Sequence, residues 1–270
     1  MTAFVNQADF VVTTALKRKP ELESQAKDIA VELNRPYVPR NNRSAAAVLN
    51  ACSVAGLLVV STGKLSFVSA GGDVFFFHPG LAGMRINSLA KGENDWMIEA
   101  MALKPGDRVL DCTMGLGVDA IVAGYVAGST GLVVGLESSM ALAYLVKTGL
   151  CSYSAGDEIL LNAMRRIQVA GGDHLDYLRG LAANSFDVVY FDPMFRHPRL
   201  RSASINSLRT LADPAPVTGL AVQLAVRVAR KRVVLKEGRG SAEFGRLGFT
   251  KIMGGAYAPI KYGVIDCYEK

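Results

Sequence analysis

A strand, a glycine turn and a helix follow one another in the middle of the chain, and this order constrains the fold more than any other feature. Val109 and Leu110 form a short apolar run that ends at an acid, Asp111. Gly115 and Gly117 follow, and glycine takes positive φ and lets another group approach the backbone closely. After the glycines, residues that are mostly apolar recur at the spacing of one helix face, and they are Val118, Ile121, Val122, Tyr125 and Val126. We therefore expect a buried strand, a tight turn and a helix whose first N–H groups lie beside the turn.

A glycine turn at the carboxyl end of a strand predicts a pocket for a nucleotide or nucleoside. The pattern Gly115-x-Gly117-x-x-Ala120 also satisfies the dinucleotide fingerprint, with Glu137 near the position of a ribose-binding acid. Asp111, however, would crowd a pyrophosphate, whereas it suits a cationic or aminoacyl ligand. The segment of strand, glycine turn and helix also begins near residue 108, with nearly a hundred residues before it. These features favour S-adenosylmethionine (SAM) over NAD as the ligand.

Composition restricts the class of protein. The chain has 270 residues, of which 50% are hydrophobic, so it can bury one large core or a core with an appended module. Its net charge of +6 favours a polyanionic partner. The four cysteines have no C-x-x-C spacing, which indicates reduced thiols rather than a zinc site. Without a basic signal segment or an apolar run of membrane-span length, we expect a cytoplasmic protein that does not associate with membranes.

The sequence pattern predicts a small α+β module over residues 1–80 and a separate domain over residues 81–270. The module should contain short strands and two helices, at 10–15, 20–33, 45–55, 57–61, 65–69 and 74–77. Its basic residues form either a phosphate-binding surface or a solvated face, and they are Lys17, Arg18, Lys19, Arg35, Arg40 and Arg43. The segment 85–95 is rich in glycine and asparagine and reads as a linker. A helix over 95–103 then leads into the first strand of the domain.

From Arg108 strands and helices alternate, which predicts a parallel sheet with helices on both faces. The second strand ends at Glu137, whose carboxylate can accept both hydroxyl groups of a ribose. The third strand ends before Asp173, which would either accept the exocyclic amine of adenine or cap the following helix. The remaining helices and strands are expected at 204–211, 217–228, 230–236, 249–257 and 262–268. The fold class is α/β, with a Rossmann-like sheet.

The fourth strand runs from Phe186 to Asp192 and continues directly into Pro193. In a doubly wound sheet this strand end lies where ligands bind. An exocyclic amine on a base is a poor nucleophile because its lone pair is delocalised into the ring. Hydrogen bonds from that amine to the Asp192 carboxylate and the Pro193 carbonyl favour a pyramidal nitrogen, and Phe195 offers a flat face for an unstacked base. The basic loop that follows would hold flanking phosphates through Arg196, Arg199 and Arg201.

Together these residues resemble a known family, the class I SAM-dependent methyltransferases, and most closely the RsmJ-type small-subunit ribosomal RNA guanine-N2 methyltransferases. The resembling stretches are Val109-Leu-Asp-Cys-Thr-Met-Gly-Leu-Gly-Val-Asp-Ala120, Leu136-Glu137, Asp187-Val-Val-Tyr-Phe-Asp-Pro-Met-Phe195 and Lys231-Arg-Val-Val-Leu-Lys236. The resemblance covers residues 80–265 and implies ribosomal RNA as partner. It places cofactor contacts at Val118, Asp119, Glu137, Ser138, Asp173, His174 and Asp192. Val118 and Ser138 stand where members often carry arginine.

Three hypotheses for function follow from these observations. The first is N-methylation of an exocyclic amine of an RNA base, with guanine N2 in small-subunit ribosomal RNA preferred. The second is methylation of a small molecule or a protein at the same site. The third is a protein that binds SAM or RNA without turnover. A metal is not required, because the sulfonium of SAM is already a reactive electrophile.

Overall fold

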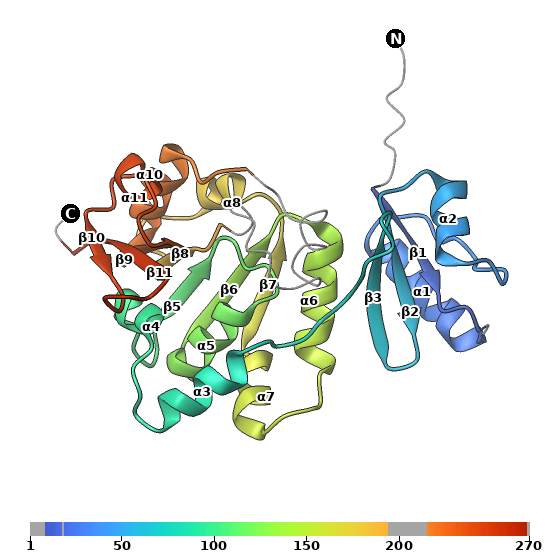
Figure 1. The fold of residues 1–270 in the computed structure, drawn as a ribbon, viewed down its shortest axis with the longest axis horizontal. Helices are drawn as coiled ribbons and strands as arrows, with labels where there is room; N and C mark the ends of the chain where they lie inside the picture. The colour runs from blue at the N-terminus through green and yellow to red at the C-terminus, as the bar shows by residue number, and fades with distance from the viewer. Residues whose placement is uncertain (1–8, 18, 194–214, 269–270) are drawn as a thin grey trace, which may run out of the picture. The chain divides into compact units, whose positions relative to one another are not determined.

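The structure, a computed structural model, describes residues 9–17, 19–193 and 215–268. Within these residues, contacts divide the chain into two compact units, with the division between Phe77 and His78. Figure 1 shows the elements of both units along the chain. Two separate domains at 1–80 and 81–270 stay a prediction, because compactness alone does not show that either part folds independently.

The first unit contains a four-stranded sheet in the order β1-β2-β3-β4. β1 pairs in parallel with β2, and β2, β3 and β4 form the antiparallel meander expected from the sequence. Two helices, α1 and α2, occupy the connection between β1 and β2. The elements are β1 (Phe10–Thr14), α1 (Pro20–Glu32), α2 (Ala45–Cys52), β2 (Gly56–Ser61), β3 (Lys64–Ser69) and β4 (Val74–Phe76).

Local sequence signals explain where these two helices begin and end. α1 starts with Pro20, which has no N–H to leave unpaired in the first turn. α2 is capped by Ser44, whose side chain accepts a hydrogen bond from the Ala47 N–H at 3.1 Å. It ends at Cys52 rather than at the predicted residue 55, because Ser53 adopts the left-handed conformation with φ of 52°.

The second unit contains a seven-stranded sheet in the order β10-β11-β9-β8-β5-β6-β7. The five strands from β7 to β9 are parallel, and β11 runs antiparallel to both of its neighbours. The strands are β5 (Arg108–Asp111), β6 (Leu132–Glu137), β7 (Ile167–Gly171), β8 (Phe186–Phe191), β9 (Ala229–Gly238), β10 (Lys251–Met253) and β11 (Ile260–Asp266). This is the Rossmann-like sheet that the sequence predicts. The order of the strands reverses at β5, which has β6 on one side and β8 on the other.

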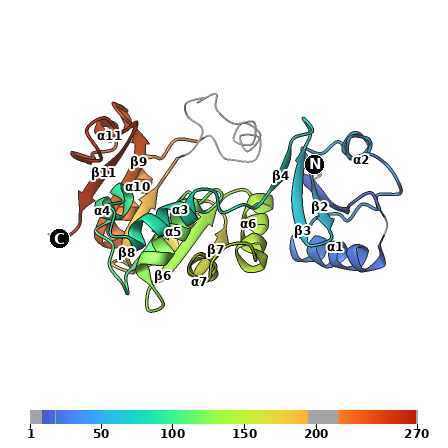
Figure 2. The same ribbon diagram turned by 60° about the horizontal axis from the view of Figure 1, so that its bottom comes forward.

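Two groups of helices cover this sheet. α3, α5 and α7 contact one another, and α8 packs against α10. In Figure 2, α3, α4 and α5 lie in front of the strands. The helices are α3 (Ala82–Ala90), α4 (Trp96–Met101), α5 (Val118–Ala127), α6 (Met140–Ser152), α7 (Glu158–Arg165), α8 (His174–Gly180), α10 (Gly219–Val228) and α11 (Glu243–Arg246).

The prediction of a linker over residues 85–95 was wrong in its first half. Residues 82–90 form α3, which buries Ala82 and Ile86 against its neighbours. Gly83 brings the helix close to α7, since an added Cβ there would lie 3.4 Å from a methyl group of Leu160. Burial of one face therefore outweighs the low helix propensity of glycine and asparagine in this segment.

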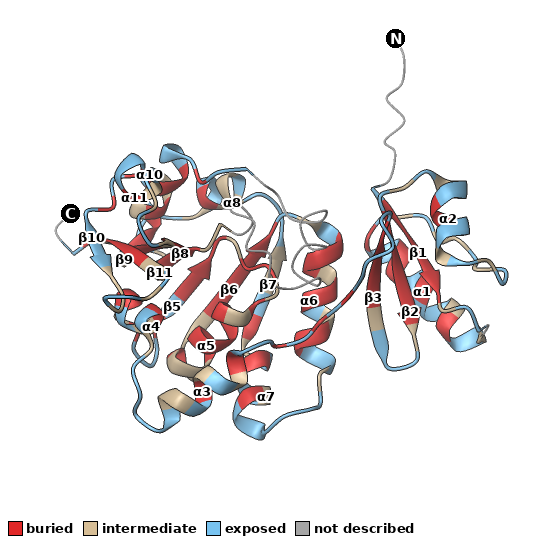
Figure 3. Ribbon diagram, viewed as in Figure 1, coloured by how far each residue is buried: buried red, intermediate tan, exposed pale blue. Residues whose placement is uncertain are grey.

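The central strands of the second unit are fully enclosed, as the burial colours in Figure 3 show. All six residues of β8 are buried, and Val109 and Leu110 of β5 are at most 1% exposed.

The four cysteines are free thiols. Among the described residues, no helix combines the length and apolar character needed to cross a membrane.

The glycine turn after β5 is fixed against the neighbouring strand by Met114. The Met114 N–H donates to the Leu136 carbonyl at 2.9 Å. Its side chain occupies the space over Gly135, where an added Cβ would lie 1.9 Å from the Met114 sulfur. Gly135 therefore lets the turn lie directly on β6, and this contact sets the position of the residues that follow β5.

We expect Gly135→Ala to destabilise the protein by about 1–3 kcal/mol, because Met114 must leave a well-packed position. Gly171→Ala is the matched control on β7, since nothing lies within 4 Å of its added Cβ. Chemical unfolding of the full chain measures both. The double variant Gly135→Ala/Met114→Ala should lose less stability than the two single variants combined. Simple additivity would show that the two residues do not oppose each other.

Candidate functional site

Polar side chains lie at the carboxyl ends of all five parallel strands in the second unit. They are Asp111 at the end of β5, Glu137 at the end of β6, Asp173 after β7, Asp192 after β8 and Lys236 near the end of β9. Because the strands are parallel, these ends share one edge of the sheet. The four carboxylates were predicted to lie on this edge, and the structure places them there.

Thr113 joins the end of β5 to the end of β8. Its backbone N–H donates to the Asp111 carboxylate at 3.1 Å. Its hydroxyl oxygen accepts a hydrogen bond from the Asp192 N–H at 2.6 Å. The backbone of Asp192 is therefore held beside the first residues of the glycine turn, and Pro193 follows it directly.

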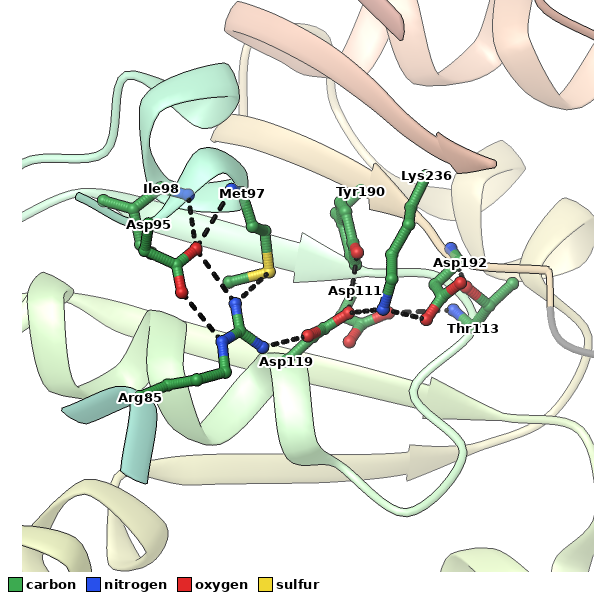
Figure 4. Close-up of polar contacts among 10 residues, drawn as sticks. All are labelled: Arg85, Asp95, Met97, Ile98, Asp111, Thr113, Asp119, Tyr190, Asp192 and Lys236. Carbon is green, nitrogen blue, oxygen red and sulfur yellow. Dashed lines mark hydrogen bonds and ion pairs between the residues drawn. The ribbon is translucent and has the colours of Figure 1, made fainter. Parts of the chain in front are cut away.

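Lys236 lies between two carboxylates, as Figure 4 shows. Its ammonium group is 2.7 Å from Asp192 Oδ2 and 2.8 Å from Asp119 Oδ2. Asp119 belongs to the first turn of α5, whereas Asp192 follows β8. One cation thus connects the start of the helix after the glycine turn with the end of the central strand.

Three side chains contact the Asp119 carboxylate, and they are Arg85, Tyr190 and Lys236. Its Oδ1 pairs with Arg85 at 2.5 Å, and its Oδ2 also accepts a hydrogen bond from the Tyr190 hydroxyl at 2.7 Å. Arg85 extends the cluster to α4 through two contacts with the Asp95 carboxylate, at 2.8 and 3.0 Å. Figure 4 shows this continuous series of contacts from Asp95 to Asp192. Both oxygens of Asp119 are therefore engaged by other residues of the protein.

The shared cation separates the acidities of the two carboxyl groups. For Asp119, burial opposes ionisation, but Lys236 and Arg85 outweigh it and lower the pKa. Within the described residues Asp192 has only Lys236 as a cationic partner, so burial, together with the charge of Asp119, raises its pKa to about 6. Burial also raises the pKa of Asp111 well above its ordinary value. Of the two carboxyl groups that share Lys236, Asp119 is thus the permanent anion and Asp192 is the one that can titrate near neutrality.

Two tyrosines complete the surroundings of this cluster. Burial and the neighbouring carboxylates raise the pKa of Tyr190, so its hydroxyl stays protonated and donates to Asp119. Burial raises the pKa of Tyr262 on β11 to about 12. Asp192 therefore interacts with ionisable groups from several elements, among them Asp111, Asp119, Tyr190 and Lys236, whereas Tyr262 acts on Lys236 and Asp119.

Glu137 is buried at the end of β6, with 7% of its surface exposed. Its Oε1 accepts hydrogen bonds from the Ser139 N–H at 2.8 Å and from the exposed Ser138 hydroxyl at 3.4 Å.

The glycine turn between β5 and α5 has the positive φ angles that the sequence predicts, 51° at Gly115 and 78° at Gly117. Val118, the first residue of α5, packs close to Gly80 in the segment that precedes α3.

Asp173 caps α8, which is one of the two roles expected for it. Its carboxylate accepts hydrogen bonds from the N–H groups of Leu175 and Asp176 at 2.8 and 3.2 Å. His174 is half-buried, with its ring edge against Phe191 at 5.9 Å between centroids. A contact of Asp173 or His174 with the cofactor stays a prediction. Phe195, Arg196, Arg199 and Arg201 lie outside the described residues.

Lys236 and Tyr190 were not predicted as site residues from the sequence. Lys236 follows the apolar run Val233–Leu235, so the rule that identified Asp111 and Asp192, a charged residue at the end of a buried strand, also applied to it. For Tyr190 no such signal exists, because it is an aromatic residue inside an apolar strand. Among the described residues, no group of His, Cys, Asp or Glu is arranged to hold a metal ion.

Comparisons with known proteins identify a family and relatives of this chain. A family model described as "Putative SAM-dependent methyltransferase" matches residues 67–245. The protein YpiP of Bacillus subtilis (strain 168) is 42% identical over 95% of this chain and 99% of its own length. Ribosomal RNA small subunit methyltransferase J of Cellvibrio japonicus is 32% identical over 55% of this chain, and the match spans 58% of that relative. A crystal structure of a SAM-dependent methyltransferase from Neisseria gonorrhoeae has the same fold, with a TM-score of 0.65, 16% identity and 96% of each chain covered.

Asp119→Asn should destabilise the protein by about 3–5 kcal/mol near neutral pH, because Arg85 and Lys236 lose their shared buried anion. The matched control is Asp266→Asn, since Asp266 is 41% exposed and also pairs with two cations; its cost should stay below about 1 kcal/mol.

Chemical unfolding at several pH values measures both variants. The folded pKa of Asp119 lies below its ordinary value of 3.8, so its contribution is present above pH 3.8 and lost as the pH falls further. The difference between wild type and Asp119→Asn should therefore shrink only below that pH. Equal costs for the two variants at neutral pH would contradict this account.

Proposed function

Because the chain belongs to this family of SAM-dependent methyltransferases, we propose that it methylates an exocyclic amine of a base in RNA, with guanine N2 of small-subunit ribosomal RNA preferred. The observation that carries the proposal is the Asp192 carboxylate. It follows the central strand β8, it lies beside the glycine turn, and Lys236 engages only its Oδ2. Its Oδ1 accepts no hydrogen bond within the described residues, so it can receive one from a substrate amine.

The residues at this edge fit SAM. Glu137 offers a buried carboxylate for the ribose hydroxyl groups at the end of β6. Asp111 is 2% exposed and accepts a hydrogen bond only from the Thr113 N–H among described partners. A cationic ligand group would stabilise its ionised form against burial. In this proposal, Glu137 and Asp111 are the principal cofactor residues, whereas Asp119 holds Lys236 and Arg85 in place.

SAM, when bound, would supply an electrophilic methyl group on a sulfonium; its S–C bond would break as the amine lone pair forms the N–C bond, and the sulfur would leave as a neutral thioether. Asp192 accepts a hydrogen bond from the amine, and the Pro193 carbonyl accepts a second one, which keeps the nitrogen pyramidal. After transfer the nitrogen is cationic and must lose a proton, and ionised Asp192 can take it and release it to water. Lys236 fixes one carboxylate oxygen and favours the ionised form, so it is a positioning residue in this mechanism.

RNA as the substrate rests on three observations. The relatives that match about half of this chain are named as ribosomal RNA methyltransferases, and the sequence contains Asp192-Pro193 followed by Phe195, which suits an unstacked base. The net charge of +6 favours a polyanionic substrate over a neutral metabolite. Arg196, Arg199 and Arg201 follow this motif along the chain, and we propose that they contact phosphates beside the target nucleotide.

Glu137→Ala should weaken SAM binding by about 1.5–3 kcal/mol, because hydrogen bonds to an ionised group are lost. Isothermal titration calorimetry measures the affinity, and NADH should not compete with SAM. Asp176→Ala, which removes an exposed carboxylate from α8, is the control and should bind SAM as wild type does. Unchanged affinity in Glu137→Ala would remove Glu137 from the cofactor site.

Methyl transfer should fall as the pH decreases through about 6, because Asp192 accepts a proton only when it is ionised and its pKa is about 6. The measurement uses radiolabelled SAM and small-subunit ribosomal RNA from a strain that lacks this gene. Lys236→Met should move the acidic limb of the rate profile to higher pH, because Lys236 lowers the Asp192 pKa. Lys236→Arg retains the charge and should keep the limb near its wild-type position.

Two further variants separate the mechanism from a structural effect. Asp192→Ala should bind SAM and RNA but transfer methyl groups very slowly across the whole pH range. Asp192→Asn still offers an oxygen acceptor but does not titrate, so its residual activity should lack the acidic limb near pH 6. If Asp192→Ala transferred methyl groups to RNA as fast as wild type, the amine-methylation mechanism would be wrong. Activity on small molecules alone would instead favour the second hypothesis.

A further inference from the structure

The loop between α1 and α2 in the first unit is anchored along the edge of the sheet. The Val12 N–H donates to the Pro36 carbonyl at 2.9 Å, and the Val38 N–H donates to the Val12 carbonyl at 2.8 Å. Tyr37 thereby forms a parallel bridge with β1 at Val12. These bonds give residues 36–38 a defined backbone position, so the residues that follow them start from a fixed point.

This part of the chain has an unbalanced charge. From Leu33 to Gly72 the sequence contains four basic residues and neither aspartate nor glutamate; the basic residues are Arg35, Arg40, Arg43 and Lys64. Within the described residues, none of the three arginines pairs with a carboxylate. In the second unit, by contrast, the half-buried cations Arg85 and Lys236 each contact two carboxylates.

Backbone carbonyl groups hold Arg40 and Arg43 together. Arg40 Nε donates to the Arg43 carbonyl at 2.7 Å, and Arg43 Nε donates to the Arg40 carbonyl at 3.4 Å. Arg43 Nη2 also donates to the Pro39 carbonyl at 3.0 Å. The turn between them contains Asn41 and Asn42, both in the left-handed conformation, with φ of 47° and 57°. Two like charges are thus fixed close to each other, although neither has an anion among the described residues to balance it.

The pair also has unused hydrogen-bonding capacity. Both side chains are half-buried, and Arg40 Nη1 is buried without an acceptor in the described structure. Burial lowers the pKa of Arg40, and the charge of Arg43 lowers it further. Buried donors without acceptors are rare in proteins. A phosphate that meets the exposed parts of these half-buried side chains would supply the missing negative charge, and guanidinium groups match phosphate geometry well.

We propose that Arg40 and Arg43 form a phosphate-binding site in the first unit, which holds the sugar–phosphate backbone of the RNA substrate. This inference rests on the proposed function, because RNA is the phosphate-bearing ligand that the reaction requires. The site contributes affinity and registers the strand, but it reads no base, since phosphate contacts carry no sequence information. The first unit is then a docking module for RNA, distinct from the residues that bind SAM and the target amine.

Binding of a fluorescein-labelled RNA hairpin to the full chain, measured by fluorescence anisotropy at several NaCl concentrations, tests this site. Arg40→Gln/Arg43→Gln should weaken binding about tenfold at low salt. Its slope of log affinity against log salt should fall by about 1.4, which corresponds to two lost phosphate contacts at about 0.7 each on a single strand. SAM affinity, measured by calorimetry, should not change.

The matched control is Arg165→Gln/Arg166→Gln. These arginines end α7 and precede β7, on the opposite edge of the second sheet from Asp192, and Arg165 is likewise held by backbone carbonyl groups. The control removes the same charge and should leave the salt slope near its wild-type value. Equal losses in the two double variants would attribute the effect to net charge and overturn the site.

The remaining outcomes separate this inference from the proposed function. If wild type binds the hairpin and Arg40→Gln/Arg43→Gln binds it equally well, the phosphate site is wrong while RNA remains the substrate. If wild type binds SAM but no RNA even at low salt, the RNA substrate is wrong, and this inference fails with it. Circular dichroism establishes that the variant is folded before either result is used.

Discussion

The contact on which the site depends is that of one lysine with two buried carboxylates. Lys236 cannot lie beside Asp119 and Asp192 unless the end of β9, the first turn of α5 and the end of β8 are brought to the same place. Removing water from these charges opposes folding, and only good geometry and additional hydrogen bonds offset that loss. Tyr190 and Arg85 supply those bonds on the Asp119 side. Asp192 has fewer partners, and this asymmetry leaves it as the group that can exchange a proton.

The backbone that carries these charges is defined by packing at the glycine turn. Met114 lies over Gly135, Thr113 bonds the Asp192 backbone, and the left-handed Gly117 starts α5 in the orientation that places Asp119 under Lys236. A side chain on Gly135 would displace the turn, and a displaced turn would separate Asp119 from Asp192. Fold and site are therefore coupled through contacts between apolar atoms that take no part in the chemistry.

The two units balance their positive charge differently. In the second unit, carboxylates neutralise Arg85 and Lys236, which makes their cluster a self-contained part of the site. In the first unit, as far as the structure describes it, Arg40 and Arg43 are held only by the partial charges of carbonyl groups, which orient a guanidinium without neutralising it. The first arrangement suits a precisely placed reactive group, and the second suits attraction of an external anion. A methyltransferase that acts on RNA would need both.

The sequence by itself determined the order of the five parallel strands along the chain and the edge of the sheet on which their terminal acids lie. Hydrophobic periodicity, the glycines at positions 115 and 117 and the acids that end successive strands are local signals, and parallel strands necessarily bring their carboxyl ends together. The helix over residues 82–90 could not be read this way, because burial against other helices overrides weak local propensity there. Only the tertiary structure decided that Lys236 joins Asp119 to Asp192, since these residues are 117 and 44 positions apart from it in the chain. Which charges meet, and therefore which carboxyl group can titrate, depends on distances of a few ångströms that no local pattern encodes.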